Sequence, residues 1–227
     1  MKHLLSPLLA LLFPVIAFAG PDPDPARFDK EIVAFDAADA KAAPEKGGIV
    51  FTGSSSIRLL DLKKVFPGLK ALNRGFGGSH ISDVNHYLDR CLLRYEPSLV
   101  VFYCGGNDLW DKKSPEQVEE DFTEFQRRLF EKSPQAKLIV MAVRPSPSRV
   151  SIRDKEADLN ARFKKAAEAD KRITYVAGSC DRFLDKTGET IQERGLAARM
   201  PCRRPDQSSS SLLPPFTRTL PRSLASM

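Results

Sequence analysis

The sequence predicts an α/β protein, a three-layer α/β/α sandwich built around a five-stranded parallel sheet. Two observations favour this fold. Five short apolar segments bounded by glycine or proline alternate with stretches of helical periodicity. The apolar segments are rich in Val, Ile, Leu and Phe without polar alternation, as expected for strands buried on both faces. Right-handed crossovers between such strands make them parallel.

The expected elements can be placed in chain order. A helix over residues 26–43 precedes the first strand. Strands are expected at residues 48–52, 69–73, 99–104, 137–142 and 173–176. The intervening helices are expected at residues 81–95, 115–132 and 151–169. Pro115 suits the first turn of its helix, because a backbone N–H would have no partner there, and Ser114 is placed to cap that helix.

The first 20 residues have the features of a secretory signal peptide. Lys2 precedes an apolar run from Leu4 to Phe18, and a small-x-small sequence ends at Ala19. The run is shorter than the ~20 residues that a membrane-spanning helix needs, and prolines interrupt it. We therefore expect residues 1–19 to be removed, the mature protein to be periplasmic or secreted, and no membrane span to remain.

Three parts are expected in the mature chain. Residues 20–26 are rich in Pro and Asp and predict a stiff spacer that joins neither helix nor sheet. Residues 27–193 are long enough for one domain with a substantial core. Residues 194–227 differ abruptly in composition, because 17 of these 34 residues are Arg, Pro or Ser and none is Lys or Glu. Such a tail is expected to be disordered.

The basic charge of the chain lies in this tail. Of the formal net charge of +6, the tail contributes +5 and Lys2 the remainder, so the domain itself is neutral. A neutral domain does not favour a nucleic-acid partner. The change in composition at Arg194 indicates a shifted reading frame or a recombined 3′ end, and a natural basic extension is the alternative.

Four cysteines are present, Cys91, Cys104, Cys180 and Cys202, and no two have the Cys-x-x-Cys spacing of many metal sites. In an exported chain they allow one or two disulfides. Cys104 lies in an apolar strand, where a small buried thiol is the favoured interpretation. No metal is expected.

Three glycine-containing segments follow the first three expected strands and carry Ser55, Gly78 and Asn107. Because the carboxyl ends of parallel strands meet at one edge of a sheet, we expect these loops to converge. Ser55 lies at a turn into a helix, whose backbone N–H groups and dipole could stabilise negative charge. The N–H of Gly78 and the side-chain amide of Asn107 could donate to the same oxygen, as in an oxyanion hole.

Each segment has a simpler interpretation when taken alone. The serines around Ser55 could cap a helix, Gly78 could lie in a flexible turn, and Asn107 could cap a loop. A dinucleotide-binding loop at residues 75–78 is a further alternative. Position 80, where that motif needs a third glycine, is His80, and the segment does not follow the first strand.

In combination, these segments resemble the SGNH (GDSL-like) hydrolase family, in its Gly-Ser-Ser-Ser branch. Residues 49–55 resemble the nucleophile block, with Ser54 where the family commonly has Asp. The second and third blocks are matched by residues 73–78 and 105–108. The segments after the fourth strand also resemble the family, at residues 141–149 and 158–160.

The resemblance covers about residues 27–193 and implies a flavodoxin-like fold and a serine ester hydrolase (esterase or lipase-like). It implies Ser55 as the nucleophile and Gly78 and Asn107 as oxyanion-hole residues. The implied substrate is a small-molecule ester with an acyl or acetyl group, and no cofactor is implied. Oligomeric state does not follow from the sequence.

The family's general base comes from an Asp-x-x-His block after the last strand, and the sequence has no histidine after His86. The domain is therefore expected to be incomplete at its C-terminal end, where the atypical tail begins. His86 lies inside an expected helix. His80 is the histidine nearest the site, but no acidic partner is expected to orient it.

Two hypotheses follow from the missing base. The chain is an ester hydrolase by ancestry, whose rate depends on the oxyanion hole and binding alone, worth ~10³–10⁴ over water. Alternatively, it is a catalytically inactive protein that binds an ester or a glycan at the same edge of the sheet.

Overall fold

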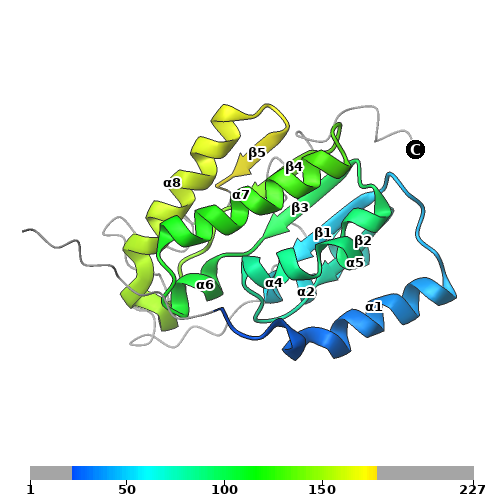
Figure 1. The fold of residues 1–227 in the computed structure, drawn as a ribbon, viewed down its shortest axis with the longest axis horizontal. Coiled ribbons are helices and arrows are strands. Elements are labelled where there is room, and N and C mark those ends of the chain that lie inside the picture. Colours follow the sequence, from blue (N-terminus) through cyan, green and yellow to red (C-terminus); the bar gives the residue numbers. More distant parts are fainter. Residues whose placement is uncertain (1–21, 178–227) are drawn as a thin grey trace, which may run out of the picture.

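The computed structural model describes residues 22–177, which form one parallel sheet flanked by helices (Figure 1). The strand order is β2-β1-β3-β4-β5, and every neighbouring pair is parallel. The strands are β1 (Ile49–Gly53), β2 (Ala71–Gly75), β3 (Leu99–Tyr103), β4 (Lys137–Met141) and β5 (Ile173–Val176). The predicted five-stranded α/β fold is confirmed. The expected signal peptide and basic tail lie outside the described residues.

Eleven helical segments connect or precede the strands within residues 22–177. The α-helices are α1 (Asp29–Lys41), α2 (Ser55–Arg58), α3 (Leu62–Val65), α4 (Ile81–His86), α5 (Leu88–Cys91), α6 (Gly106–Trp110), α7 (Pro115–Lys132) and α8 (Arg153–Ala169). The 3-10 helices are η1 (Pro25–Phe28), η2 (Leu93–Tyr95) and η3 (Pro147–Ile152). None of these helices is long and apolar enough to cross a membrane.

The two faces of the sheet bury separate apolar clusters. Val100 and Phe102 belong to the cluster that packs against α1, α4, α5, α7 and α8. Phe51 and Val101 belong to the opposite cluster, which includes residues of α2 and α3. Neighbouring residues of β3 thus point to opposite cores, which explains why this strand has no polar alternation.

Helix α7 forms as predicted from its sequence. Ser114 accepts a hydrogen bond from the Gln117 N–H, and the Gln117 side chain accepts one from the Ser114 N–H, which completes a capping box. Phe122 and Phe125 face the core, and Phe125 packs on Phe102 of β3 with ring centroids 4.4 Å apart. This stripe of aromatic side chains fixes α7 on the sheet.

The single helix expected at residues 81–95 is interrupted. It forms as α4, α5 and η2, and its first break is at Tyr87, whose backbone has φ −97° and ψ 13°. The Tyr87 hydroxyl donates to the Pro25 carbonyl and the Asp29 carboxylate over 2.9 and 2.7 Å. These partners lie outside the segment, so its own periodicity could not show the break.

The spacer expected at residues 20–26 is wrong for its described part, since Pro25 begins η1 and Asp24 caps this helix by accepting from the Ala26 N–H at 2.9 Å. Asp22 forms an ion pair with Lys113 and accepts a hydrogen bond from Ser82. The reason is local, because an Asp-Pro step supplies both a cap and a first-turn residue.

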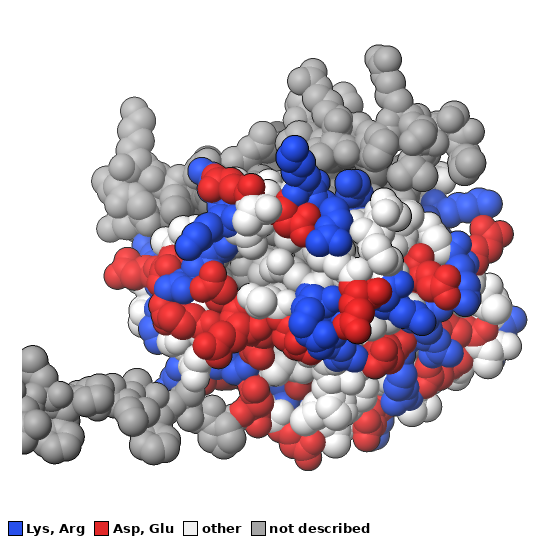
Figure 2. Space-filling view, turned by 45° about the horizontal axis from the view of Figure 1, so that its top comes forward, with Lys and Arg blue, Asp and Glu red and all other residues white. Residues whose placement is uncertain are grey.

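Cys91 and Cys104 are both buried free thiols, as expected for Cys104. Burial raises the pKa of the Cys91 thiol to about 12. Cys180 and Cys202 lie outside the described residues. On the face shown in Figure 2, Lys and Arg side chains are interspersed with Asp and Glu.

A buried ion pair joins α1 to β2. Arg74 pairs with Asp39 and also donates to the Tyr95 hydroxyl at 2.9 Å, while that hydroxyl donates to Asp39. The guanidinium also lies over the rings of Phe35 and Tyr95. Burial and the neighbouring carboxylate raise the pKa of Tyr95 to about 12. The Asp39 carboxylate therefore binds both the Arg74 guanidinium and the Tyr95 hydroxyl.

Replacing Asp39 by alanine leaves a buried guanidinium unpaired, which should lower the free energy of unfolding by about 3–5 kcal/mol. Urea denaturation followed by circular dichroism measures the change. Lys30→Ala, at an exposed position of the same helix, is the control and should change stability by less than about 0.5 kcal/mol. Equal effects of the two substitutions would contradict a specific role of the network.

Candidate active site

Ser55 begins α2, directly after β1, and its position depends on Gly53. Gly53 has φ +127°, and a Cβ at this residue would lie 2.1 Å from the carbonyl oxygen of Tyr103. Only glycine therefore permits β1 and β3 to approach this closely. The N–H of Ser54 donates to the same Tyr103 carbonyl at 2.9 Å, which fixes the turn. Ser55 itself is half-buried.

The carboxyl ends of the first three strands lie level with one another. Gly53 is paired with Gly75 of β2 on one side and with Tyr103 of β3 on the other. The loops that follow these strands therefore start from the same edge of the sheet, as the sequence predicts.

Ser55 and Asn107 line one pocket at this edge, with a volume of about 380 Å³. Its walls come from four parts of the chain: the turn after β1, the turn after β3, the segment between β4 and α8, and the first turn of α8. The other lining residues are Ser54, Ser56, Tyr103, Gly106, Val143, Arg144, Pro145, Ser146, Pro147, Ser148, Arg149 and Glu156.

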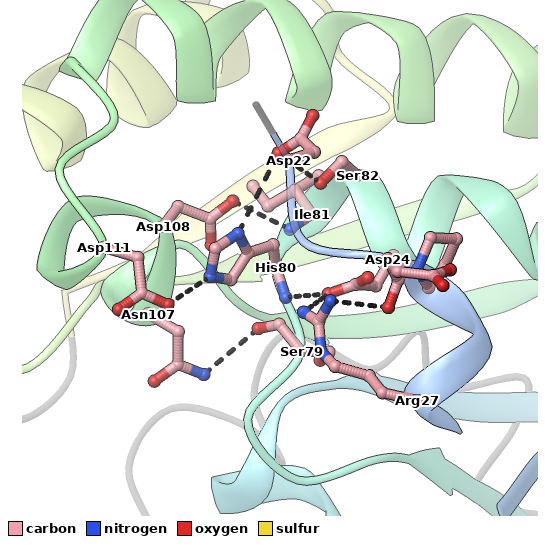
Figure 3. A network of polar contacts seen from close by, with 12 residues as sticks. Asp22, Asp24, Arg27, Ser79, His80, Ile81, Ser82, Asn107, Asp108 and Asp111 are labelled. Carbon is pink, nitrogen blue, oxygen red and sulfur yellow. Dashed lines mark hydrogen bonds and ion pairs between the residues drawn. The ribbon is translucent and has the colours of Figure 1, made fainter. Parts of the chain in front are cut away.

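Asn107 joins the loop after β3 to the loop after β2. Its Nδ2 donates to the Ser79 carbonyl at 3.1 Å (Figure 3), and its Oδ1 accepts from Arg149 at 2.9 Å. Cys104 adds a second link, because its thiol lies 3.3 Å from the same Ser79 carbonyl. These contacts hold residue 79, the neighbour of Gly78, beside Asn107.

Gly78 is exposed and does not itself line the pocket. It has φ +86°, a conformation that other residues rarely adopt, and a Cβ there would meet nothing within 4 Å. The glycine is thus required by the backbone conformation and not by crowding. The structure brings Ser55 and Asn107 to one pocket and places Gly78 next to the residue that Asn107 contacts.

The helix dipole expected to assist Ser55 is small. Helix α2 contains only four residues, Ser55–Arg58, so few peptide dipoles are aligned at its start. Hydrogen-bond donors close to the pocket must therefore supply most of any stabilisation of negative charge.

The expectation that His80 has no acidic partner is wrong. Its Nε2 lies 2.8 Å from a carboxylate oxygen of Asp111, and its Nδ1 lies 3.9 Å from Asp22 (Figure 3). The ring is only 1% exposed and does not line the pocket. Asp111 and Asp22 were missed because they lie 31 and 58 positions away in the sequence. His86 is exposed and packs against Tyr87.

Asp108, next to Asn107, is fully buried and accepts a hydrogen bond from the Ile81 N–H at 2.9 Å. Burial raises the pKa of Asp108 to about 6, and the neighbouring His80 opposes that rise. Because Ile81 begins α4, this contact provides a third link between the loops that carry Gly78 and Asn107.

The segment between β4 and α8 forms one wall of the pocket and is anchored by Asn160. The Val143 N–H donates to Asn160 Oδ1 at 2.8 Å, and Asn160 Nδ2 donates to the Val143 carbonyl at 2.9 Å. Beyond this anchor, Arg144 donates to Ser56 at 3.2 Å and lies over the Tyr103 ring. Residues 141–149 of this segment resemble a family pattern, but the sequence alone assigns no role to Arg149 or to Glu156 at the start of α8.

Glu156 is a buried carboxyl group in the pocket wall. It is 3% exposed, and its Oε2 accepts no hydrogen bond from the described part of the chain. Burial raises the pKa of Glu156 to about 7, while the charges of Arg149 and Arg153 oppose that rise. Within residues 22–177, no group of three His, Cys, Asp or Glu side chains is arranged to hold a metal ion.

Comparison with known proteins identifies the family and the fold of the chain. Residues 58–198 match the GDSL-like lipase/acylhydrolase family, a match that covers more than half of the chain and begins after Ser55. The chain therefore belongs to this family, whose members define a class of esterase-type hydrolases. No curated protein matches the sequence.

Solved structures share the fold at low sequence identity. A proposed platelet activating factor from Streptococcus pneumonia has a TM-score of 0.63 and 18% identity, over 73% of this chain and 80% of that one. A GDSL-like lipase from Bacteroides thetaiotaomicron has a TM-score of 0.54 and 21% identity, over 75% and 90% of the two chains. A proposed acylhydrolase from Bacteroides fragilis has a TM-score of 0.55 and 18% identity, over 78% and 94%.

The raised pKa of Glu156 predicts a stability that falls as pH rises. Unfolding lowers the pKa from about 7 toward its ordinary value of 4.5, so the unfolded chain binds fewer protons between these pH values. The wild type should therefore lose stability between pH 5 and pH 8, and Glu156→Gln should lose about 1–3 kcal/mol less. Urea titrations at both pH values measure this difference. A loss that is unchanged in the variant would rule out Glu156 as its source.

Proposed function

We propose that this chain is a serine hydrolase of small acyl or acetyl esters, in the Gly-Ser-Ser-Ser branch of its family. The observation that carries the proposal is the meeting of Ser55 and Asn107 in one pocket. The two residues are 52 positions apart in sequence and come from turns after neighbouring strands. A hydroxyl and an amide donor in one pocket are what acyl transfer through a tetrahedral intermediate requires.

In the proposed reaction, Ser55 Oγ attacks the ester carbonyl carbon and passes its proton to a water molecule, and water returns a proton to the leaving alkoxide. The carbonyl oxygen becomes an oxyanion, which accepts hydrogen bonds from the N–H of Ser55 and from Asn107 Nδ2 in the pocket. The family resemblance adds the N–H of Gly78, which does not itself line the pocket. One Nδ2 hydrogen is used by the Ser79 carbonyl, and the other remains for the oxyanion. Collapse releases the alcohol, and water then hydrolyses the acyl-serine.

The base that accepts the Ser55 proton limits this reaction. No histidine lines the pocket within residues 22–177, and His80 directs its ring nitrogens toward Asp111 and Asp22 (Figure 3). Without a histidine base, attack by Ser55 is expected to be far slower than in a complete Ser-His-Asp triad, with an enhancement of no more than about 10³–10⁴ over the reaction in water. We therefore propose slow turnover, without a metal or cofactor.

A second candidate function follows from the same observation. A pocket with an oxyanion hole and no base fits a protein that binds an ester or a glycan without cleaving it. For either function, we propose export to the periplasm or the medium, which is supported by the composition of residues 1–19.

Hydrolysis of p-nitrophenyl acetate distinguishes these functions. We expect slow turnover by the wild type, background rates with Ser55→Ala, and a loss of about 10²–10³ in kcat with Asn107→Ala. Ser151→Ala is the control, because Ser151 is exposed and does not line the pocket. Release of p-nitrophenol at 405 nm gives the rates.

Two results would change the assignment. Turnover that survives Ser55→Ala contradicts a serine mechanism. No turnover by the wild type, with binding of phenyl acetate detected by ligand NMR and lost in Asn107→Ala, supports the binding function in its place.

A further inference from the structure

We propose that Arg149 is a positioning residue of the oxyanion hole, which orients and polarises the amide of Asn107. This inference rests on the proposed function, because it assigns Asn107 to the oxyanion. The sequence places Arg149 at the end of the segment that resembles the family, residues 141–149, but its role follows from the contacts that the fold creates.

Arg149 binds two acceptors in the turn after β3. Its Nη1 donates to the Gly106 carbonyl at 2.8 Å, and its Nη2 donates to Asn107 Oδ1 at 2.9 Å. The acceptors belong to consecutive residues, so one planar guanidinium holds both the backbone and the side chain of this turn. A lysine, with a single nitrogen, has no comparable fork.

These contacts determine which way the Asn107 amide points. If the amide were rotated by 180°, its NH₂ group would face the guanidinium, and its oxygen would face the Ser79 carbonyl. Donor would then oppose donor and acceptor would oppose acceptor. Arg149 and Ser79 therefore both favour the orientation in which Nδ2 is directed away from Arg149.

The charge of Arg149 also strengthens Asn107 as a donor. A cation bound to the amide oxygen draws electron density from the nitrogen and makes its N–H groups more positive. The effect is greatest when negative charge develops on a substrate oxygen, which is the condition for lowering a barrier. Arg149 thus acts on the transition state through Asn107 without contacting the reacting atoms.

The surroundings of Arg149 support this geometry. Its backbone leaves the helical conformation within η3, with φ −128° and ψ 31°. The guanidinium lies over the ring of Trp110, 5.4 Å from its centroid. The carboxyl group of Glu156 interacts electrostatically with Arg149 and lines the same pocket. The cation is thereby held between the Trp110 ring and two oxygen acceptors.

The experiment compares Arg149→Met, Arg149→Lys and the wild type. Arg162→Met is the control, because Arg162 lies on α8 outside the pocket and pairs with Glu119 and Asp158. The first measurement is the ¹⁵N-¹H NMR signal of the Asn107 side-chain amide, assigned by its loss in Asn107→Ala. It reports on the orientation of the amide whether or not the protein turns over.

We expect Arg149→Met to shift the Asn107 amide signals and to accelerate their exchange with water, while Arg162→Met leaves them unchanged. With p-nitrophenyl acetate, Arg149→Met should lower kcat by about 10- to 100-fold, less than loss of the amide itself, with KM changed less than about twofold. Arg149→Lys should recover part of kcat, because it restores the charge without the fork.

The outcomes separate this inference from the proposed function. An Asn107 amide whose signals and exchange rate are the same in Arg149→Met and the wild type overturns the positioning role. A kcat unchanged in Arg149→Met, in an enzyme that depends on Ser55, overturns it as well. If the wild type does not turn over at all, the proposed hydrolase function fails, and the amide measurement alone decides the role of Arg149.

Discussion

The close approach of β1 and β3 at Gly53 places the rest of the site. Because this residue has no side chain, the carbonyl of Tyr103 can accept the N–H of Ser54, and the chain turns directly into α2. The same register sets Gly53 level with Gly75 of β2. Three loops consequently leave the sheet at one height, so Ser55 and Asn107 share a pocket although they are distant in sequence.

Structural features that depend on neighbouring residues in the chain could be predicted from the sequence. The burial of β3 on both faces appears as an unbroken apolar run, and Ser114 with Pro115 defines the start of α7 to the residue. The glycine and asparagine that follow strands likewise identified the edge of the site. These features depend on propensity and on the geometry shared by all parallel sheets.

The parts that could not be predicted depend on contacts between distant segments. The break at Tyr87 follows from its bonds to Pro25 and Asp29, and the ring of His80 is set by Asp111. None of these three partners is indicated by the spacing or periodicity of the sequence. The role of Arg149 is of the same kind, because an arginine after a strand becomes informative only when its two acceptors are known.

Asn160 anchors the pocket wall through the backbone of the segment that follows β4. Its side chain bonds the backbone of Val143, in the manner of a neighbouring strand, so this anchor does not depend on which side chains follow. The residues from Arg144 to Ser148 form part of the pocket wall beyond this anchor. Side chains from Arg144 to Ser148 can therefore be replaced without breaking the bonds between Asn160 and the Val143 backbone.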